Sequence, residues 1–324
     1  IRVVERSRGL GDVYKRQKQG FDAIFIGIGA WAVRKLGVEG EDLDGVISGV
    51  TFLKDVAAGK DVKVADRVAI IGGGNVAIDA ARTCLRMGAK EVTIVYRRSR
   101  KEMPANPEEI DAAEHEGIKM HFLAAPVKLH GENGKLKKLE FVRMELGEPD
   151  ASGRRRPIPI EGSETMIDVD QLITAIGQFP DLLTPEEDKY MEKLGITRWK
   201  TFEADPDTMY TGKEGIFVGG DIYHGPLTVI TALADGRKAA YAIDKYFKGE
   251  DLKPPKEEFN ISRGSFETID KSIFEGIPKQ ERQKMSELEV AERVKTFAEV
   301  ELGLTEEQAL EEAKRCLLCG CGAA

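Results

Sequence analysis

A glycine-rich turn between a strand and a helix constrains the fold of this chain more than any other feature. Residues 67–98 have the sequence RVAIIGGGNVAIDAARTCLRMGAKEVTIVYRR. The apolar run Arg67–Ile71 predicts a buried strand, and Asn75–Met87 has apolar residues at the spacing of a helix that stops at Gly88. Glu91–Tyr96 predicts a second strand. This strand–helix–strand unit predicts an α/β fold with a parallel sheet.

The turn has the spacing Gly-x-Gly-x-x-Ala, which is typical of dinucleotide binding. Gly72 allows a tight turn, Gly74 lets a pyrophosphate approach the backbone, and Ala77 allows the helix to pack closely on the strand. The phosphates would meet the free N–H groups at the positive end of the helix. The alternative is a glycine turn in an ordinary α/β domain. The expected cofactor contacts are Gly72, Gly74, Asn75, Val76 and Ala77.

The residues that follow the second strand predict which nucleotide binds. NAD sites place Asp or Glu at this point, where the carboxylate binds the ribose. This chain has Arg97 and Arg98 instead, with Arg100 and Lys101 close behind. A guanidinium can bind a 2′-phosphate through two parallel hydrogen bonds, whereas a carboxylate would repel it. We therefore predict NADPH over NADH, against the alternative of a basic surface turn.

Composition argues against several classes of protein. The 324 residues include 56 acidic and 48 basic side chains, a net charge of −8, whereas a general nucleic-acid binder would have a basic face. No apolar run approaches the roughly 18 residues that cross a bilayer, and no secretory signal pattern is visible, so we expect a cytoplasmic protein.

Four cysteines cannot form a disulfide framework in a chain of this length. Cys84 lies alone on the apolar side of the first helix and is expected in the core.

A second glycine pattern, Gly27-x-Gly29-x-x-Ala32, also follows a short predicted strand. The residues after it, Val33–Gly40, contain two further glycines and no long amphipathic stretch. Because the fingerprint requires a helix at this point, we do not expect an independent nucleotide site there.

Four blocks of sequence occur together in the order typical of one family. They are GGGNVAIDAAR, VYRRSRKEMPA, AIGQFPD and GGDIYHGPLTVITALADGRKAA. On these blocks the chain resembles the small (beta) subunit of NADPH-dependent glutamate synthase and its flavoprotein relatives, over roughly residues 20–250.

The resemblance implies a flavoprotein with two dinucleotide-binding domains, in which a Rossmann-like NADPH domain is inserted into an FAD domain. The NADPH domain would span residues 61–175, and later pieces of the FAD domain would span 18–60 and 176–250. The FAD domain is expected to be incomplete, because the family's amino-terminal half, with its FAD fingerprint and iron–sulfur cysteines, is missing. Residues 251–324 would form a helical tail. Residues 1–17 resemble translated sequencing-adapter read-through and are expected to be non-native or disordered.

The resemblance also implies contacts with FAD. Asp221 would accept hydrogen bonds from ribityl hydroxyls or nearby groups, with close approach allowed by Gly219 and Gly220. The start of the next helix would offer backbone N–H groups to the flavin pyrimidine edge. His224 lies where the motif is tolerant, and we expect a loop histidine that donates no proton. The expected FAD contacts are Gly177, Gly220, Asp221, Leu227, Thr228 and Val229.

Three cysteines are clustered near the carboxyl end, at Cys316, Cys319 and Cys321. Iron–sulfur clusters are bound by cysteine thiolates at short spacings like this one. Three interpretations stay open: a 4Fe–4S cluster, which we favour, a zinc site, or thiols without a metal.

The expected function is transfer of hydride from NADPH to flavin, followed by transfer of electrons to iron–sulfur centres or a partner subunit such as a glutamate synthase large subunit. The cofactors would supply the chemistry, so no catalytic acid, base or nucleophile is predicted. One alternative is the electron-input subunit of another complex, of formate dehydrogenase, hydrogenase or ferredoxin–NADP type. The other is a non-catalytic nucleotide-binding scaffold.

Several local elements can also be predicted. Glu132-Asn133-Gly134 lies between two alternating runs and predicts a hairpin. Helices are expected at residues 226–246, with alanine on the packing face, and at 286–302 and 305–314. The last of these begins with the capping-box pattern Thr305-x-x-Gln308.

Overall fold

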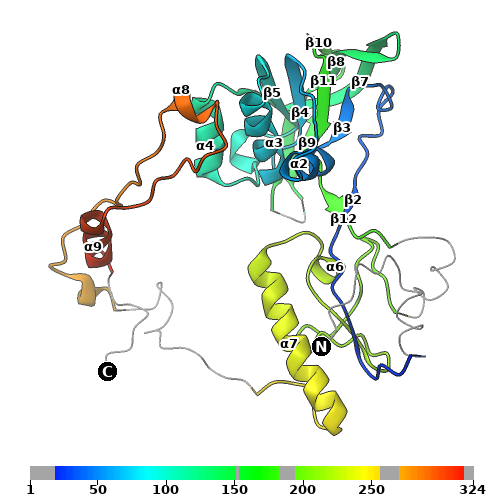
Figure 1. Ribbon diagram of the computed structural model, residues 1–324, viewed down its shortest axis with the longest axis vertical. Coiled ribbons are helices and arrows are strands. Elements are labelled where there is room, and N and C mark those ends of the chain that lie inside the picture. The colour runs from blue at the N-terminus through cyan, green and yellow to red at the C-terminus, as the bar shows by residue number, and fades with distance from the viewer. Residues whose placement is uncertain (1–18, 151–152, 183–193, 256–269, 317–324) are drawn as a thin grey trace. The chain divides into compact units, whose positions relative to one another are not determined.

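The largest parallel sheet in the described residues has five strands. The computed structural model describes residues 19–150, 153–182, 194–255 and 270–316. The sheet has the order β3-β11-β4-β5-β6, and every neighbouring pair is parallel. Helices α2, α3 and α4 belong to the same body (Figure 1). The bounds are β3 (Val46–Ser48), α2 (Gly49–Ala57), β4 (Arg67–Ile71), α3 (Asn75–Arg86), β5 (Glu91–Tyr96), η1 (Arg100–Glu102), α4 (Pro107–His115), β6 (Lys119–Phe122) and β11 (Gln171–Thr174).

The central strands β4 and β5 are buried at every position after the first, because both faces of the sheet are covered. In β4, Val68 to Ile71 are all buried. Side chains that alternate along the strand point to opposite faces, and Ala69 and Ile71 pack in one cluster with Leu139 and Phe141 of an antiparallel sheet. On α3, Ala77, Ile78, Ala80, Ala81 and Cys84 are buried. The predicted strand–helix–strand unit is therefore confirmed.

The antiparallel sheet is built around a long hairpin. β7 (Ala124–Glu132) pairs with β8 (Lys135–Pro149), and β8 also pairs with β10 (Thr165–Asp168) and β9 (Arg155–Pro159). Between β7 and β8, Asn133 and Gly134 have φ of 53° and 77°, which is the left-handed geometry of a tight hairpin turn. The hairpin predicted at this point is confirmed.

The five-stranded sheet includes residues that precede position 61. Val46–Ser48 forms β3, which pairs with β11, and the helix that follows it is α2. These residues lie within the FAD-domain segment predicted for residues 18–60. β3 extends the sheet that the glycine turn belongs to, and the domain bounds stay a prediction.

A smaller parallel sheet, of two strands, lies in the same unit of the chain. β1 (Ile24–Ile26) and β13 (Ile216–Val218) are parallel, and β13 is followed along the chain by α6 (Asp221–His224) and α7 (Val229–Lys248). Two buried clusters surround this pair, one around Phe202, Val218 and Ile222 and one around Phe217 and Ala239. β2 (Ala32–Val33) and β12 (Gln178–Phe179) form an antiparallel pair. Along the chain, β2 lies between β1 and β3, and β12 lies between β11 and β13. No long helix follows Gly27 and Gly29, as expected; the next element is β2.

Residues 85–88 and the described residues 270–316 form a second compact unit. It contains η2 (Lys271–Phe274), α8 (Val290–Arg293) and α9 (Glu306–Lys314). The helix at 305–314 is confirmed together with its capping box, in which Thr305 and Gln308 each bond to the other's backbone N–H. The helix expected over 286–302 is wrong. Only α8 is helical there, because the segment folds back on itself and Leu288 N donates to Val300 O at 2.9 Å.

Candidate functional site

The glycine-rich turn lies where β4 ends at Ile71 and α3 begins at Asn75. β4 is flanked by β5 on one side and β11 on the other, which makes this edge a switch point where open α/β sheets bind ligands. Gly72 has φ of 146°, and a Cβ there would lie 2.3 Å from the carbonyl oxygen of Ala175. At Gly74 the atom nearest to such a Cβ would be Pro104 Cγ, at 3.9 Å. The turn therefore requires glycine at position 72 and leaves the backbone open at position 74.

A neighbouring segment supports this turn. The side-chain oxygen of Asn75 accepts a hydrogen bond from Asn106 N at 3.1 Å, and the carbonyl of Gly73 accepts one from Ala105 N at 3.2 Å. Ala77 is fully buried, as expected for close packing of the helix on the sheet. The first N–H groups of α3 have no acceptor within the helix. The predicted contacts Gly72, Gly74, Asn75, Val76 and Ala77 thus all lie in the turn or at the start of α3, and their contact with a pyrophosphate stays a prediction.

The two arginines after β5 have different surroundings. Arg97 is exposed. The Arg98 side chain is 5% exposed, and it forms an ion pair with Asp150 at 2.7 Å and donates to the carbonyl of Arg155 at 2.6 Å. Desolvation first, and then the neighbouring guanidinium of Arg98, lower the pKa of Arg97 below the ordinary value for arginine. Arg97 is therefore the residue available to an anion, whereas Arg98 has partners within the chain.

The turn that follows these arginines is held by its own side chains. Ser99 and Glu102 form a capping box around η1, and the Tyr96 hydroxyl donates to the carbonyl of Glu102 at 2.8 Å. The hydrogen bond from the Ser99 hydroxyl lowers the pKa of Glu102. These contacts fix the backbone next to Arg97.

A hollow lies beside the ends of β3 and β11 at the same edge of the sheet. Ser48 and Thr174, the last residues of these strands, lie in its wall. The other lining residues belong to β2, to β3 and to the segment between them, and the charged ones carry both signs. They are Val33, Arg34, Lys35, Val38, Glu39, Gly40, Glu41, Asp42, Val46 and Ile47.

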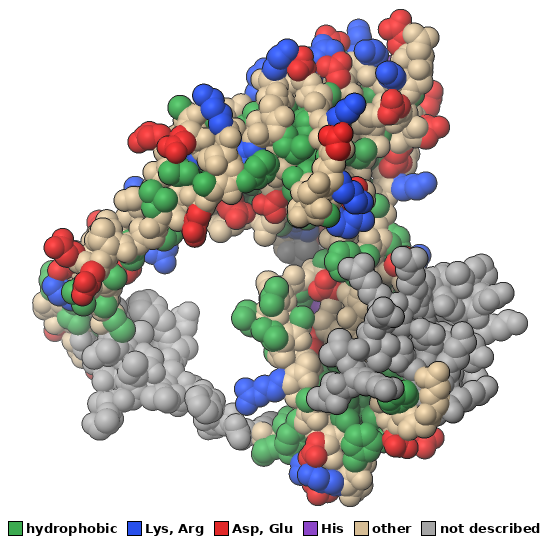
Figure 2. Space-filling model, in the orientation of Figure 1, with side chains coloured by type: hydrophobic (Ala, Val, Ile, Leu, Met, Phe, Trp, Pro, Cys, Tyr) green, Lys and Arg blue, Asp and Glu red, His purple; other side chains and the backbone are tan. Residues whose placement is uncertain are grey.

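The second predicted binding region lies between β13 and α7. Gly220 has φ of 72° and precedes α6, which begins at Asp221. One carboxylate oxygen of Asp221 accepts a hydrogen bond from Leu227 N at 3.2 Å, so two of the predicted FAD contacts bond to each other. Thr228 is the N-cap of α7, where its side chain accepts from Thr231 N. Leu227 and Val229 are 60% and 77% exposed, respectively, at the start of this helix, where hydrophobic side chains lie on the surface (Figure 2).

Asp235 is a functional candidate that sequence reasoning missed. It is 2% exposed on α7, and it accepts a hydrogen bond from Gly220 N at 2.8 Å. Its carboxylate also lies 3.0 Å from Nε2 of His224, so this histidine, which ends α6, is paired with a buried acid. The sequence feature that could have identified Asp235 is a single acidic residue among the alanines of ALADGRKAA. Asp235 links the glycine turn before α6 to the middle of α7.

Gly177 lies in the connection from β11 to β12 and has φ of 102°. Its carbonyl accepts a hydrogen bond from Arg34 N at 3.2 Å, beside the β2–β12 pair. Gly177 thus lies where the chain passes from β11 into the β2–β12 pair.

The cysteines lie in contrasting environments. Burial raises the pKa of Cys84 to about 12, and the residue is in the core as expected. Cys316 is exposed just after α9, and Cys319 and Cys321 lie outside the described residues. Within the described ranges, no group of three or more His, Cys, Asp or Glu side chains is placed to hold a metal ion.

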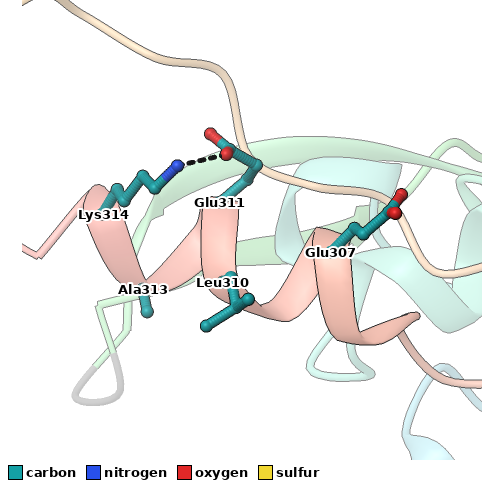
Figure 3. A pocket seen from close by; sticks show the side chains of 5 residues that line it. All are labelled: Glu307, Leu310, Glu311, Ala313 and Lys314. Carbon is teal, nitrogen blue, oxygen red and sulfur yellow. Dashed lines mark hydrogen bonds and ion pairs between the residues drawn. The ribbon is translucent and has the colours of Figure 1, made fainter.

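α9 has a shallow hollow along one side (Figure 3). Its lining residues are Glu307, Leu310, Glu311, Ala313 and Lys314, and Lys314 pairs with Glu311. All five residues belong to one helix, so the hollow does not lie between packed elements. We place the candidate site at the ends of the parallel strands instead.

Comparison with known proteins identifies the family. Residues 3–236 match the family described as pyridine nucleotide-disulphide oxidoreductase. The chain belongs to this family. The match begins within residues 1–17, which were expected to be non-native or disordered. None of the helices in the described parts of the chain has both the length and the apolar character needed to cross a membrane.

Curated relatives include subunits of redox enzymes. The chain is 42% identical over 308 residues to the NADP(+)-dependent formate dehydrogenase subunit beta of Moorella thermoacetica, covering 92% of this chain and 42% of that protein. It is 36% identical over 236 residues to the glutamate synthase [NADPH] small chain of Escherichia coli, covering 69% of this chain and 50% of that protein. The predicted resemblance to the glutamate synthase small subunit is confirmed. The chain spans about half the length of these relatives or less.

A solved structure shares the fold. Mycobacterium tuberculosis FprA in complex with NADPH has a TM-score of 0.57 and 22% sequence identity, covering 74% of this chain and 66% of that one. The expected architecture of two dinucleotide-binding domains is confirmed by this family's fold.

Proposed function

We propose that this chain is the NADPH- and FAD-binding part of an oxidoreductase that takes electrons from NADPH. One observation carries the proposal. A glycine turn at the switch point of a parallel sheet is followed, at the end of the next strand, by exposed Arg97 where NAD sites place an acid. Both curated relatives described above have NADP in their names, which supports the same nucleotide.

The residues of the chain would bind and orient the cofactors. The pyrophosphate of NADPH would meet the open backbone at Gly74 and the N-terminus of α3, and Arg97 would bind the 2′-phosphate. The nicotinamide half would extend over the ends of β11 and β3, beside the hollow at Ser48 and Thr174. When bound, NADPH and FAD supply hydride-transfer chemistry.

On the FAD side, Gly220 and Asp221 would approach the cofactor beside the start of α7. Leu227 and Val229 are exposed there, so this end of α7 is accessible to the flavin pyrimidine edge, which the backbone N–H groups would meet. Asp235 would keep this turn in place through its hydrogen bond from Gly220 N. We assign no side chain as an acid, base or nucleophile.

We further propose that the chain works with a partner subunit in the cytoplasm. The relatives are named a subunit beta and a small chain, which supports a multi-subunit enzyme. A partner of formate dehydrogenase type is favoured by the match over 92% of the chain, against 69% for the glutamate synthase small chain. Cys316, Cys319 and Cys321 would pass electrons onward through a 4Fe–4S cluster.

Dye reduction by the intact protein tests the proposal. We expect Arg97→Ala to lower kcat/KM for NADPH by about tenfold or more, because one charge-assisted pair with the 2′-phosphate is lost, and to leave NADH unaffected. Lys101→Ala, an exposed cation four residues away, is the matched control. If Arg97→Ala leaves the preference for NADPH over NADH unchanged, the nucleotide assignment is wrong. A colourless intact protein with no NADPH-driven dye reduction would favour the scaffold alternative.

A further inference from the structure

The hollow beside the ends of β3 and β11 lies against the glycine turn. Ala175, the residue after β11, donates from its backbone N to the carbonyl of Ile71 at 2.8 Å. The carbonyl oxygen of Ala175 is also the atom that a Cβ at Gly72 would meet, at 2.3 Å. Thr174, in the wall of the hollow, is therefore one residue away from the backbone that contacts the turn. A ligand with its pyrophosphate at the turn would reach the hollow with whichever half extends toward β11.

The order of the strands decides which half of a dinucleotide that would be. β4 lies between β5 and β11. Arg97, the proposed contact for the 2′-phosphate of the adenine half, follows directly after β5. The adenine half would therefore extend over β5. The nicotinamide half would extend to the other side, over β11 and β3, where the hollow lies.

Thr174 is a buried polar residue in the wall of this hollow. It is 9% exposed, and it lies on the same face of β11 as Leu172, whose cluster packs with Val38 of the same wall. Among the described residues, none forms a hydrogen bond with the Thr174 hydroxyl. Ser48, its partner on β3, differs, because its hydroxyl accepts from Thr51 N at 3.4 Å. A buried hydroxyl without a partner costs free energy, which a ligand that bonds to it would recover.

The charges of the hollow favour a neutral ligand group over a phosphate. Two basic and three acidic residues line it, so it offers no positive field for an anion. Glu41, one of the acids, accepts from Leu36 N at 2.6 Å and from Gly37 N at 2.9 Å. The hollow has a volume of about 530 Å³, which is within the range of small-molecule sites. A carboxamide fits such a wall, because it is neutral and has both donor and acceptor atoms.

We infer that the hollow binds the nicotinamide half of NADPH and that the Thr174 hydroxyl forms a hydrogen bond with its carboxamide. The inference rests on the proposed function and goes beyond it, because it assigns a site and a residue to the half of the nucleotide that gives up the hydride. A hydrogen bond at this place would fix the orientation of the ring, which hydride transfer requires.

Binding of two nucleotides to the intact protein tests this inference. NADP⁺ contains the nicotinamide half, whereas adenosine 2′,5′-bisphosphate lacks it but keeps the 2′-phosphate. We expect Thr174→Val, which has a similar shape but no hydroxyl, to weaken binding of NADP⁺ by about fivefold, the effect of losing one hydrogen bond. Binding of the bisphosphate should be unchanged. Thr174→Ser keeps the hydroxyl and should bind both probes as the unmodified protein does.

Thr93→Val is the matched control, because Thr93 is also a buried threonine of the sheet but lies in the middle of β5, outside the hollow. It should bind both probes normally. If Thr174→Val binds NADP⁺ normally, or loses the same factor for both nucleotides, the inference is overturned and the proposed function stands. Equal losses of NADP⁺ binding in Thr93→Val and Thr174→Val would also overturn it, as a general effect of removing a buried hydroxyl. Failure of the unmodified protein to bind either nucleotide would instead reject the proposed function, and the inference with it.

Discussion

At the scale of single residues, the buried carboxylate of Asp235 carries the clearest prediction. It accepts from Gly220 N and pairs with His224. Asp235→Ala leaves both groups without this acceptor, and we expect the free energy of unfolding to fall by about 3 kcal/mol. Denaturant unfolding measures this change. Asp244→Ala is the control, since Asp244 is an exposed acid on the same helix, paired only at the surface with Lys248. Equal effects of the two substitutions would contradict the role of Asp235.

The residues themselves also show how far sequence reasoning reaches. Gly72 and Cys84 could be assigned from local spacing, because a tight turn and an apolar helix face are local properties. Arg98 could not, because its partners Asp150 and Arg155 are brought to it by the antiparallel sheet. The pattern Arg97-Arg98 predicts a phosphate site but does not tell which guanidinium is free to bind it.

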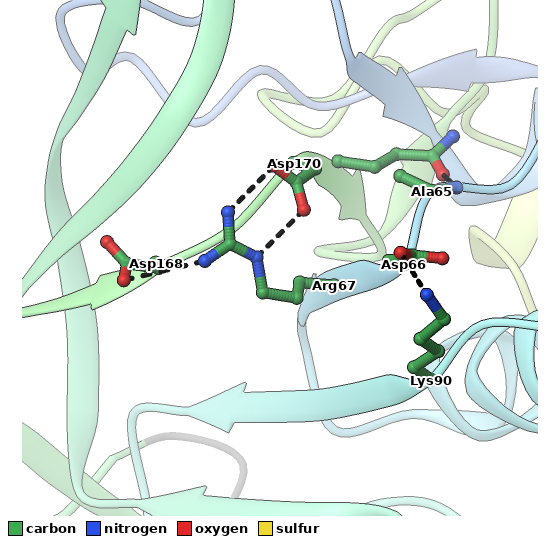
Figure 4. Close-up of polar contacts among 7 residues, drawn as sticks. Ala65, Asp66, Arg67, Lys90, Asp168 and Asp170 are labelled. Atoms are coloured by element: carbon green, nitrogen blue, oxygen red, sulfur yellow. Dashed lines mark hydrogen bonds and ion pairs between the residues drawn. The ribbon is translucent and has the colours of Figure 1, made fainter.

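At the scale of elements, an arginine fork joins the starts of β4 and β11. Arg67 Nε and Nη2 each lie 2.8 Å from an oxygen of Asp170, and Asp168 lies 3.4 Å from Nη1 (Figure 4). The side-chain hydrogen bond from Arg67 lowers the pKa of Asp170. The pair is partly exposed, so we expect Asp170→Asn to destabilise the chain by only about 1 kcal/mol at pH 7.

The lowered pKa fixes the sign of the pH dependence. The stability that this pair contributes is fully present above the pKa of Asp170 in the unfolded chain, which is near 4. It is lost as the pH falls through the lower pKa of Asp170 in the folded chain. The difference between the unmodified chain and Asp170→Asn should therefore shrink as the pH falls below about 4. Unfolding at a series of pH values measures it. Lys90→Ala, which removes the exposed pair with Asp66 in Figure 4, should have no measurable effect. A difference that grows in acid would contradict the assignment.

Elements could be predicted where their signals are local. The capping box at Thr305 and the hairpin at Asn133-Gly134 depend on neighbouring residues, and both are confirmed. The expected helix at 286–302 failed because Glu289 provides no side-chain cap and because Leu288 bonds to Val300. β3 has only three residues, and its strand partner β11 comes more than a hundred residues later, so its place in the sheet was not visible in the sequence.

At the scale of the whole molecule, apolar burial is concentrated before the carboxyl-terminal tail. In the described residues, the clusters of buried apolar side chains around the parallel and antiparallel sheets lie between Ile26 and Ala242. α9, by contrast, has no buried residue, and Leu310 is 58% exposed. Folding of the nucleotide-binding part should therefore depend little on the tail, whereas any cluster at the terminal cysteines should depend on it entirely.

A chain that ends at Pro255 separates these two properties. We expect it to bind adenosine 2′,5′-bisphosphate, a nucleotide that has the 2′-phosphate, within about twofold of the full chain, because the glycine turn and Arg97 are both retained. We also expect it to develop no iron–sulfur absorbance, near ~400 nm, after anaerobic reconstitution, because Cys316, Cys319 and Cys321 are removed. Cys84→Ala in the full chain is the control, and it should keep the absorbance because a buried thiol with a pKa of about 12 is no thiolate ligand. Absorbance in the shortened chain would place the cluster elsewhere, and loss of nucleotide binding would make the tail part of the site.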